Sequence, residues 1–91
     1  MKCVIFLPAL NEAETIQNVI SNLPGKLEGI ESILVLVVDD GSTDQTAALA
    51  VSAGAYVISH HRNRGVGSAF HSAIEFALEN NADVLVGFDA D

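Results

Sequence analysis

The sequence is poor in cysteine and in positive charge, and it has no long hydrophobic run. Cys3 is the only cysteine among 91 residues, so no internal disulfide can form and nothing requires an oxidising compartment. Lysine and arginine total 4 against 12 aspartate and glutamate residues, and the formal net charge of -8 argues against nucleic acid or an anionic membrane as a direct partner. The apolar runs are too short to span a bilayer. Pro8 interrupts the one at the N-terminus, which is more typical of a buried strand than of a signal peptide.

The rest of the composition is that of one small globular domain. Hydrophobic residues make up 49% of the chain and charged residues 18%, which separates it from disordered sequences. No repeat, low-complexity tract or linker divides it. We therefore treat residues 1–91 as a single unit, close to the lower size limit of a domain that folds alone.

Short apolar runs alternate with helical patterns along the chain. The unbroken run at residues 33–38 predicts a strand buried on both faces, as in the middle of a parallel sheet. Apolar residues at helical spacing, followed by Pro24 and Gly25, predict a helix over residues 11–23. The predicted strands cover residues 3–7, 33–38, 55–59 and 83–88, and the predicted helices cover residues 11–23, 42–53 and 65–79. This alternation predicts an α/β fold, a Rossmann-like parallel sheet of about four strands with three helices on its two faces.

The segment after the central strand combines a turn with the start of a helix. Gly41 permits the turn, and Ser42 and Gln45 fit a capping box in which Ser42 is the N-cap. Asp39 or Asp40 can then accept hydrogen bonds from a ligand, such as those of ribose hydroxyls or base N–H groups. We take Asp39 as the candidate and Asp40 as its control. The alternative is that both aspartates serve only the turn and the cap.

Acidic and amide side chains follow three of the four predicted strands. Strands of a parallel sheet end at a common edge, and ligands bind there where the strand order switches. Clustered carboxylates repel one another, and a divalent cation with oxygen ligands relieves that repulsion. Asp89 and Asp91 form a D-x-D pair suited to such a cation, although two solvated loop aspartates are the alternative. The side chains expected at this edge are Asn11, Glu12, Asp39, Asp40, Asp44, Asp89 and Asp91.

Residues 60–64, His-His-Arg-Asn-Arg, are the only cationic cluster, and Gly65 follows them at the start of a helix. Backbone N–H groups at a helix start favour phosphate. The pattern is not a dinucleotide fingerprint, because Phe70 occupies the third glycine position, and no P-loop is present. For His60 and His61 the alternative is a solvated loop or a local cap.

Four segments together resemble the nucleotide-sugar domain of family 2 glycosyltransferases of the GT-A fold. They occur in the family's order and cover nearly the whole chain. Their character is closest to the dolichol-phosphate mannosyltransferase-like branch, which uses lipid-phosphate acceptors. The segments are Leu7-Pro8-Ala9-Leu10-Asn11-Glu12, Val37-Val38-Asp39-Asp40-Gly41-Ser42-Thr43-Asp44, Asn63-Arg64-Gly65-Val66-Gly67-Ser68-Ala69 and Phe88-Asp89-Ala90-Asp91.

The resemblance implies a donor site with a metal cofactor. The segment from Pro8 and one of the two adjacent aspartates would hold the nucleoside, and the D-x-D would hold Mg²⁺ or Mn²⁺ on the diphosphate. Leu10 stands where the family often has an aromatic residue, and Val66 where many members carry lysine. The residues implied for nucleotide-sugar binding are Pro8, Leu10, Asn11, Glu12, Asp39, Asp40, Gly65, Asp89 and Ala90, and those for the metal are Asp89 and Asp91.

The resemblance also implies a reaction and a longer protein. The parent enzyme would transfer a sugar, with inversion, from a nucleotide-diphosphate sugar to a polyprenyl phosphate or a saccharide. Family catalytic domains continue beyond the D-x-D, where the acceptor site and, in many members, the general base lie. We therefore expect a fragment truncated after the D-x-D that binds donor weakly and does not turn over. We expect the parent protein in the cytoplasm or on the cytoplasmic face of a membrane.

Other readings of the same residues remain open. A non-catalytic nucleotide-binding or interaction module would use the same edge of the sheet. A phosphatase of the haloacid dehalogenase type is disfavoured, because its D-x-D follows the first strand and not the fourth. A receiver domain is disfavoured because no lysine follows Lys26. Separately, the strand over residues 83–88 is apolar on both faces with nothing after it to cover it, so we expect the isolated chain to form homo-oligomers.

Overall fold

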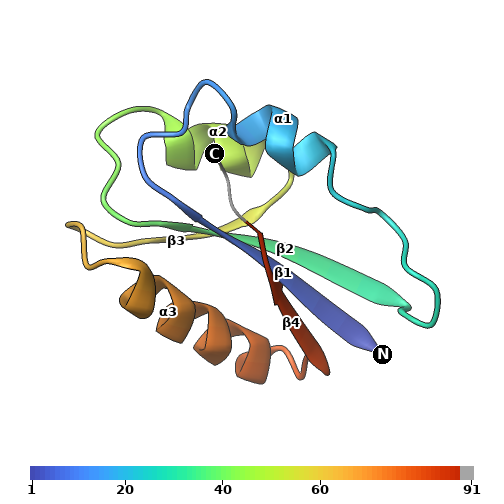
Figure 1. Ribbon diagram of the computed structural model, residues 1–91. Helices are drawn as coiled ribbons and strands as arrows, with labels where there is room; N and C mark the ends of the chain where they lie inside the picture. The colour runs from blue at the N-terminus through green and yellow to red at the C-terminus, as the bar shows by residue number, and fades with distance from the viewer. Residues whose placement is uncertain (89–91) are drawn as a thin grey trace.

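The computed structural model describes residues 1–88, except for the side chain of Val66, and shows a parallel sheet between two helical layers (Figure 1). The strand order is β3-β2-β1-β4, and every pairing is parallel. Helices α1 and α2 cover one face of the sheet and α3 covers the other (Figure 1). This arrangement confirms the predicted fold class. The elements are β1 (Lys2–Ala9), α1 (Ile16–Ser21), β2 (Ser32–Asp39), α2 (Thr46–Ser52), β3 (Tyr56–Ser59), α3 (Val66–Glu79) and β4 (Val84–Gly87).

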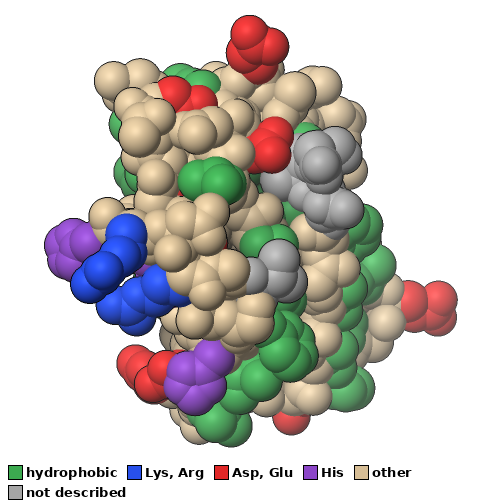
Figure 2. Space-filling view, turned by 60° about the vertical axis from the view of Figure 1, so that its left-hand side comes forward, with side chains coloured by type: hydrophobic (Ala, Val, Ile, Leu, Met, Phe, Trp, Pro, Cys, Tyr) green, Lys and Arg blue, Asp and Glu red, His purple; other side chains and the backbone are tan. Residues whose placement is uncertain are grey.

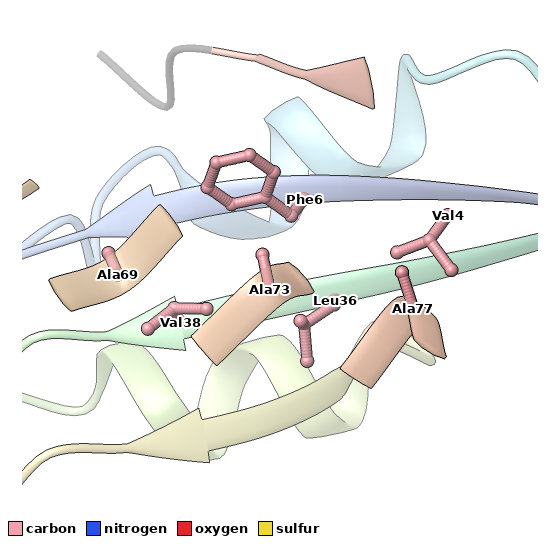
Figure 3. Packing of buried hydrophobic residues seen from close by; sticks show 7 residues of the cluster. All are labelled: Val4, Phe6, Leu36, Val38, Ala69, Ala73 and Ala77. Carbon is pink, nitrogen blue, oxygen red and sulfur yellow. The ribbon is translucent and has the colours of Figure 1, made fainter. Parts of the chain in front are cut away.

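The two central strands, β1 and β2, are buried on both faces because helices cover each side. Alternate residues of a strand point to opposite faces. One set packs against α3, whose alanines at every fourth position let the helix lie close to the sheet (Figure 3). That cluster comprises Val4, Phe6, Leu36, Val38, Ala69, Ala73 and Ala77, and the cluster beneath α1 and α2 comprises Leu7, Ala9, Ile16, Val37, Ala50 and Ala55.

Helix α1 begins later than the sequence predicts. The prediction of a helix from residue 11 is wrong at its start, because Asn11 has a positive φ of 53° and lies in a loop. The carbonyl of Glu12 accepts the backbone N–H groups of Thr15 at 3.1 Å and Ile16 at 2.8 Å, which starts the first turn. The late start leaves residues 10–13 free to follow the neighbouring loop.

Helix α2 also begins later, at Thr46, and Ser42 does not cap it. The capping-box prediction is wrong because Ser42 Oγ accepts a hydrogen bond from the backbone N–H of Asn11, at 2.8 Å, across the gap between two loops. Asp44 takes the place of the cap, since its Oδ1 accepts the N–H of Thr46 at 3.0 Å. A tertiary contact has displaced a local one.

The outer strands of the sheet are β3 and β4, each paired on one side among the described residues. Residues of β4 are half-buried or exposed, and Val86 and the neighbouring Phe88 are 36% and 44% exposed. The expected self-association of the chain stays a prediction. No helix within residues 1–88 combines the length and the apolar character needed to cross a membrane.

Candidate functional site

A pocket of about 330 Å³ opens where the carboxyl ends of the central strands meet the start of α3. The chain adds β2 and β3 on one side of β1, and α3 then returns it to add β4 on the other side. The strand order therefore switches beside β1, the position at which open parallel sheets bind ligands. The pocket is lined by Pro8, Ala9, Leu10, Glu12, Asp40, Asn63, Gly65 and Ala69.

The structure brings most of the residues expected for nucleotide-sugar binding to this pocket. Its lining includes Pro8, Leu10, Glu12, Asp40 and Gly65. Neither Asn11 nor Asp39 belongs to the lining. Asp89, Ala90 and Asp91 lie outside the described residues. Three lining residues were not singled out from the sequence, namely Ala9, Asn63 and Ala69. All three lie within the segments that carry the family resemblance, but none was chosen as a binding residue.

Asn11 fastens two loops together. Its Oδ1 accepts the backbone N–H of Thr43 at 2.9 Å, while its own N–H donates to Ser42 Oγ. Asparagine tolerates the left-handed backbone found here better than most residues. Glu12 continues the fastening by donating its N–H to Thr46 Oγ1 at 2.9 Å. The loop is thus held by its backbone and by the side chain of Asn11, while Leu10 and Glu12 line the pocket.

The carboxylate of Asp40 accepts three hydrogen bonds from residues 60–65, which form the opposite wall of the pocket. Its Oδ1 accepts from His60 Nδ1 at 2.8 Å and from the N–H of Arg64 at 2.9 Å, and its Oδ2 accepts the N–H of Gly65 at 2.8 Å. Burial opposes ionisation, but the bonds from His60 and from the two backbone N–H groups outweigh it and lower the pKa of the carboxyl. Asp40 is therefore an anion at neutral pH. A carboxylate has about four acceptor sites, so Oδ2 has one left for a ligand.

Asp39 has a different structural role from Asp40. Its Oδ1 accepts the backbone N–H of Ser42 at 3.0 Å, closing the turn after β2. The side chain is buried and outside the pocket lining. Gly41 follows with φ 91°, and a Cβ there would lie 2.8 Å from the backbone of both Arg62 and Asn63. Only glycine allows residues 60–65 to pack this closely on the turn.

The carboxylates expected at this edge do not gather into a metal cluster within residues 1–88, where no three histidine, cysteine, aspartate or glutamate side chains are placed to hold an ion. Asp39, Asp40 and Asp44 accept N–H groups of the chain instead. The predicted metal ligands, Asp89 and Asp91, lie outside the described residues.

The side chain of His60 is not solvated, as the alternative of a solvated loop would require. Its side chain is only 7% exposed, and its Nε2 lies 3.0 Å from Ser72 Oγ on α3. His61, Arg62 and Arg64 are exposed. Figure 2 shows the basic side chains grouped at one side of this face, with histidine and acidic side chains next to them. In residues 60–64, His60 thus makes a buried link between Asp40 and Ser72, and the exposed arginines supply positive charge at the surface.

Comparison with known proteins identifies relatives that match almost the full length of this chain. The chain is 40% identical over 87 residues to an uncharacterised protein of Methanocaldococcus jannaschii, which covers 96% of this chain and 34% of that protein. It is 32% identical over 104 aligned positions to a UDP-N-acetylglucosamine–dolichyl-phosphate N-acetylglucosaminyltransferase of Methanococcus voltae, covering 96% of this chain and 40% of that enzyme.

A solved structure shares the fold. The crystal structure of glucosyl-3-phosphoglycerate synthase from Mycobacterium tuberculosis, in complex with Mn²⁺, uridine diphosphate and glucosyl-3-phosphoglycerate, superposes with a TM-score of 0.76 at 31% identity. The match covers 99% of this chain and 33% of that one. The chain thus spans between a third and two fifths of the length of these relatives. The family model for glycosyl transferase family 2 matches residues 4–91, so the chain belongs to that family.

Proposed function

We propose that the pocket binds a nucleotide-diphosphate sugar and that the protein serves as a glycosyltransferase using it as donor. The observation that carries this proposal is the convergence of Pro8, Leu10, Glu12, Asp40 and Gly65 on one pocket at the switch point of the sheet. The kinship with a synthase crystallised with uridine diphosphate supports it. A pocket of about 330 Å³ is at the small end of the range typical for small-molecule sites.

We assign the nucleoside to the wall made by Pro8, Leu10 and Asp40. The two apolar residues offer a surface for the flat face of a base, and the free acceptor site of Asp40 suits a base N–H or a ribose hydroxyl. The structure favours Asp40 over Asp39 for this contact, because only Asp40 lines the pocket. Asn11 and Asp39 then support the site indirectly by holding its loops.

The diphosphate would lie toward Gly65 and the start of α3, where backbone N–H groups and nearby arginines favour anions. Asp89 and Asp91 would hold Mg²⁺ or Mn²⁺ there, with Ala90 between them, since carboxylate oxygens are the ligands these ions prefer. When bound, the ion neutralises charge on the leaving diphosphate. Structures of the related synthase hold Mn²⁺ or Mg²⁺ together with uridine diphosphate.

For the acceptor we propose a phosphate-bearing molecule, either a lipid phosphate of the dolichol type or a small phosphorylated compound, with a saccharide as the alternative. The named relatives act on dolichyl phosphate or make glucosyl-3-phosphoglycerate. A phosphate acceptor is already anionic near neutral pH, so it needs less help from a general base. Inversion at the anomeric carbon and a position at the cytoplasmic side of a membrane are parts of the same proposal.

Calorimetric titration with uridine and guanosine diphosphates, with and without Mn²⁺, tests the donor site. We expect binding of one diphosphate that Mn²⁺ strengthens, and loss of the Mn²⁺ effect in Asp89→Asn combined with Asp91→Asn. We expect no sugar transfer by the 91-residue chain itself. Absence of binding at millimolar diphosphate with Mn²⁺ present would overturn the proposal. Donor binding without transfer in any longer form of the protein would favour a non-catalytic binding module.

A further inference from the structure

We propose that His60 is a positioning residue of the donor pocket, which joins the Asp40 carboxylate to Ser72 of α3 and so fixes the pocket wall formed by residues 63–65. The inference rests on the proposed function and extends it to a side chain outside the pocket lining. Both ring nitrogens are engaged, Nδ1 with Asp40 Oδ1 at 2.8 Å and Nε2 with Ser72 Oγ at 3.0 Å. The two partners lie on opposite sides of the loop, one after β2 and one on α3.

The burial of His60 argues that its polar bonds matter. Its side chain is 7% exposed and that of Asp40 is 10% exposed. A buried polar side chain costs stability unless it is hydrogen-bonded, and an apolar side chain would fill the same space without that requirement. An ionised carboxylate only accepts hydrogen bonds, so Nδ1 of His60 must be the donor in this pair. The ring is therefore oriented by its partners as well as packed.

The pocket wall depends on the orientation of one carboxylate. Oδ1 of Asp40 is shared between His60 and the N–H of Arg64, and Oδ2 receives the N–H of Gly65. Without His60 the carboxylate keeps only the two N–H groups of the loop that it positions, so the carboxylate and the loop can shift together. Asn63 and Gly65 would then move, and both line the pocket. Misplacement of binding groups by about 1 Å can cost up to about a hundredfold in function.

Two amide substitutions separate the bond to Asp40, which is the end of the bridge that meets the pocket wall, from simple space filling. In His60→Asn the amide nitrogen reaches the place of Nδ1 and can still donate to Asp40. In His60→Gln the amide reaches the place of Nε2 and can serve only Ser72. Both lose the ring, so both should lower the melting temperature by similar amounts. Only His60→Gln should weaken uridine diphosphate binding in Mn²⁺, by roughly tenfold, the size expected for one hydrogen bond to a charged group.

A second readout does not depend on the nucleotide. The amide NMR signals of Arg64 and Gly65 report their bonds to Asp40, and we expect them to shift in His60→Gln and to stay near their original positions in His60→Asn. Equal affinity losses in the two variants, or unchanged Arg64 and Gly65 signals in His60→Gln, would overturn the positioning role while leaving the donor site intact. Failure of the unsubstituted protein to bind any nucleoside diphosphate would overturn the proposed function, and the role of His60 in donor binding with it.

Discussion

Two loops wall the pocket, residues 10–13 and residues 60–65, and they are held in different ways. The first is fastened by bonds spread over several partners, among them Ser42, Thr43 and Thr46. In the second, three bonds converge on the single carboxylate of Asp40. Loss of one bond from a distributed set leaves the others in place, whereas loss of a shared acceptor removes several at once. The two walls of one pocket should therefore differ in their sensitivity to single substitutions.

The largest effect is expected for Asp40→Ala. The change leaves His60 and the N–H groups of Arg64 and Gly65 without an acceptor, and we expect a loss of about 3 to 5 kcal/mol in the free energy of unfolding. Nucleoside diphosphate binding should disappear with it. Urea denaturation followed by circular dichroism measures the first effect and calorimetry the second.

Asp39→Ala is the matched neighbour for that experiment. It removes one bond, to the N–H of Ser42, and should cost about 1 kcal/mol with a smaller change in affinity. If Asp39→Ala weakens nucleotide binding more than Asp40→Ala does, the assignment of the nucleoside to Asp40 is wrong.

The next effect tests how closely residues 60–65 pack on the turn after β2. Gly41→Ala would put a Cβ 2.8 Å from the backbone of Arg62 and Asn63, in a residue whose φ is 91°. Gly54→Ala is the control, because its φ is 95° but a Cβ would meet nothing within 4 Å. Both should pay about 1 to 2 kcal/mol for the left-handed backbone. Gly41→Ala should lose about 1 to 3 kcal/mol more from overpacking, and it alone should weaken nucleotide binding. Equal urea midpoints for the two variants would show that residues 60–65 can move away from the added Cβ without loss of stability.

Acid should weaken the bonds that hold residues 60–65 on the Asp40 carboxylate. Burial raises the pKa of Asp40, but its hydrogen bonds outweigh burial and lower the pKa below that of an unfolded aspartate. A carboxyl whose folded pKa is depressed contributes stability that is present above the unfolded value, about 3.9, and is lost as the pH falls through the folded value. We therefore expect stability to change little through Asp40 from pH 7 to about 4 and to decline below it.

Carboxyl-detected NMR titration of Asp40 checks that expectation directly. The carboxyl signal should move at a lower pH than that of an unfolded aspartate, and the amide signals of Arg64 and Gly65 should move with it. An Asp40 signal that titrates at or above the ordinary aspartate range would contradict the assignment of the three bonds.

The fold can be predicted from local sequence patterns, whereas the separate roles of Asp39 and Asp40 in the site cannot. The apolar run at residues 33–38 predicts a strand covered on both faces, and the structure places β2 there in the sheet. The common edge of parallel strands then locates the pocket. Asp39 bonds to the N–H of Ser42 close by in the chain, whereas Asp40 accepts the N–H groups of Arg64 and Gly65, which are more than 20 positions away. The sequence around Asp40 carries no local signal of those distant partners.

The same limit explains the misplaced cap. Ser42 and Gln45 satisfy the local rule for a helix start, yet the hydroxyl of Ser42 bonds to Asn11, which is 31 positions earlier. Local propensity is a weak prior that tertiary contacts override. The buried state of His60 is another case, because its partners Asp40 and Ser72 lie 20 and 12 residues away in the chain.

The smallest effect is expected at Asn11, in the loop of residues 10–13 that several partners hold. Asn11→Gly removes the acceptor for the N–H of Thr43 but tolerates the φ of 53° without strain, so it should cost about 1 kcal/mol. Asn11→Ala loses the same bond and adds a left-handed backbone penalty of about 1 kcal/mol or more. In both variants the bonds from Glu12 to Thr46 and from Ala13 to Asp44 remain, so Leu10 and Glu12 should stay in place. Uridine diphosphate affinity should therefore stay within about threefold of the original, less than one hydrogen bond to a charged group. A tenfold loss in Asn11→Gly would show that this wall also depends on a single residue, and the contrast between the two loops would fail.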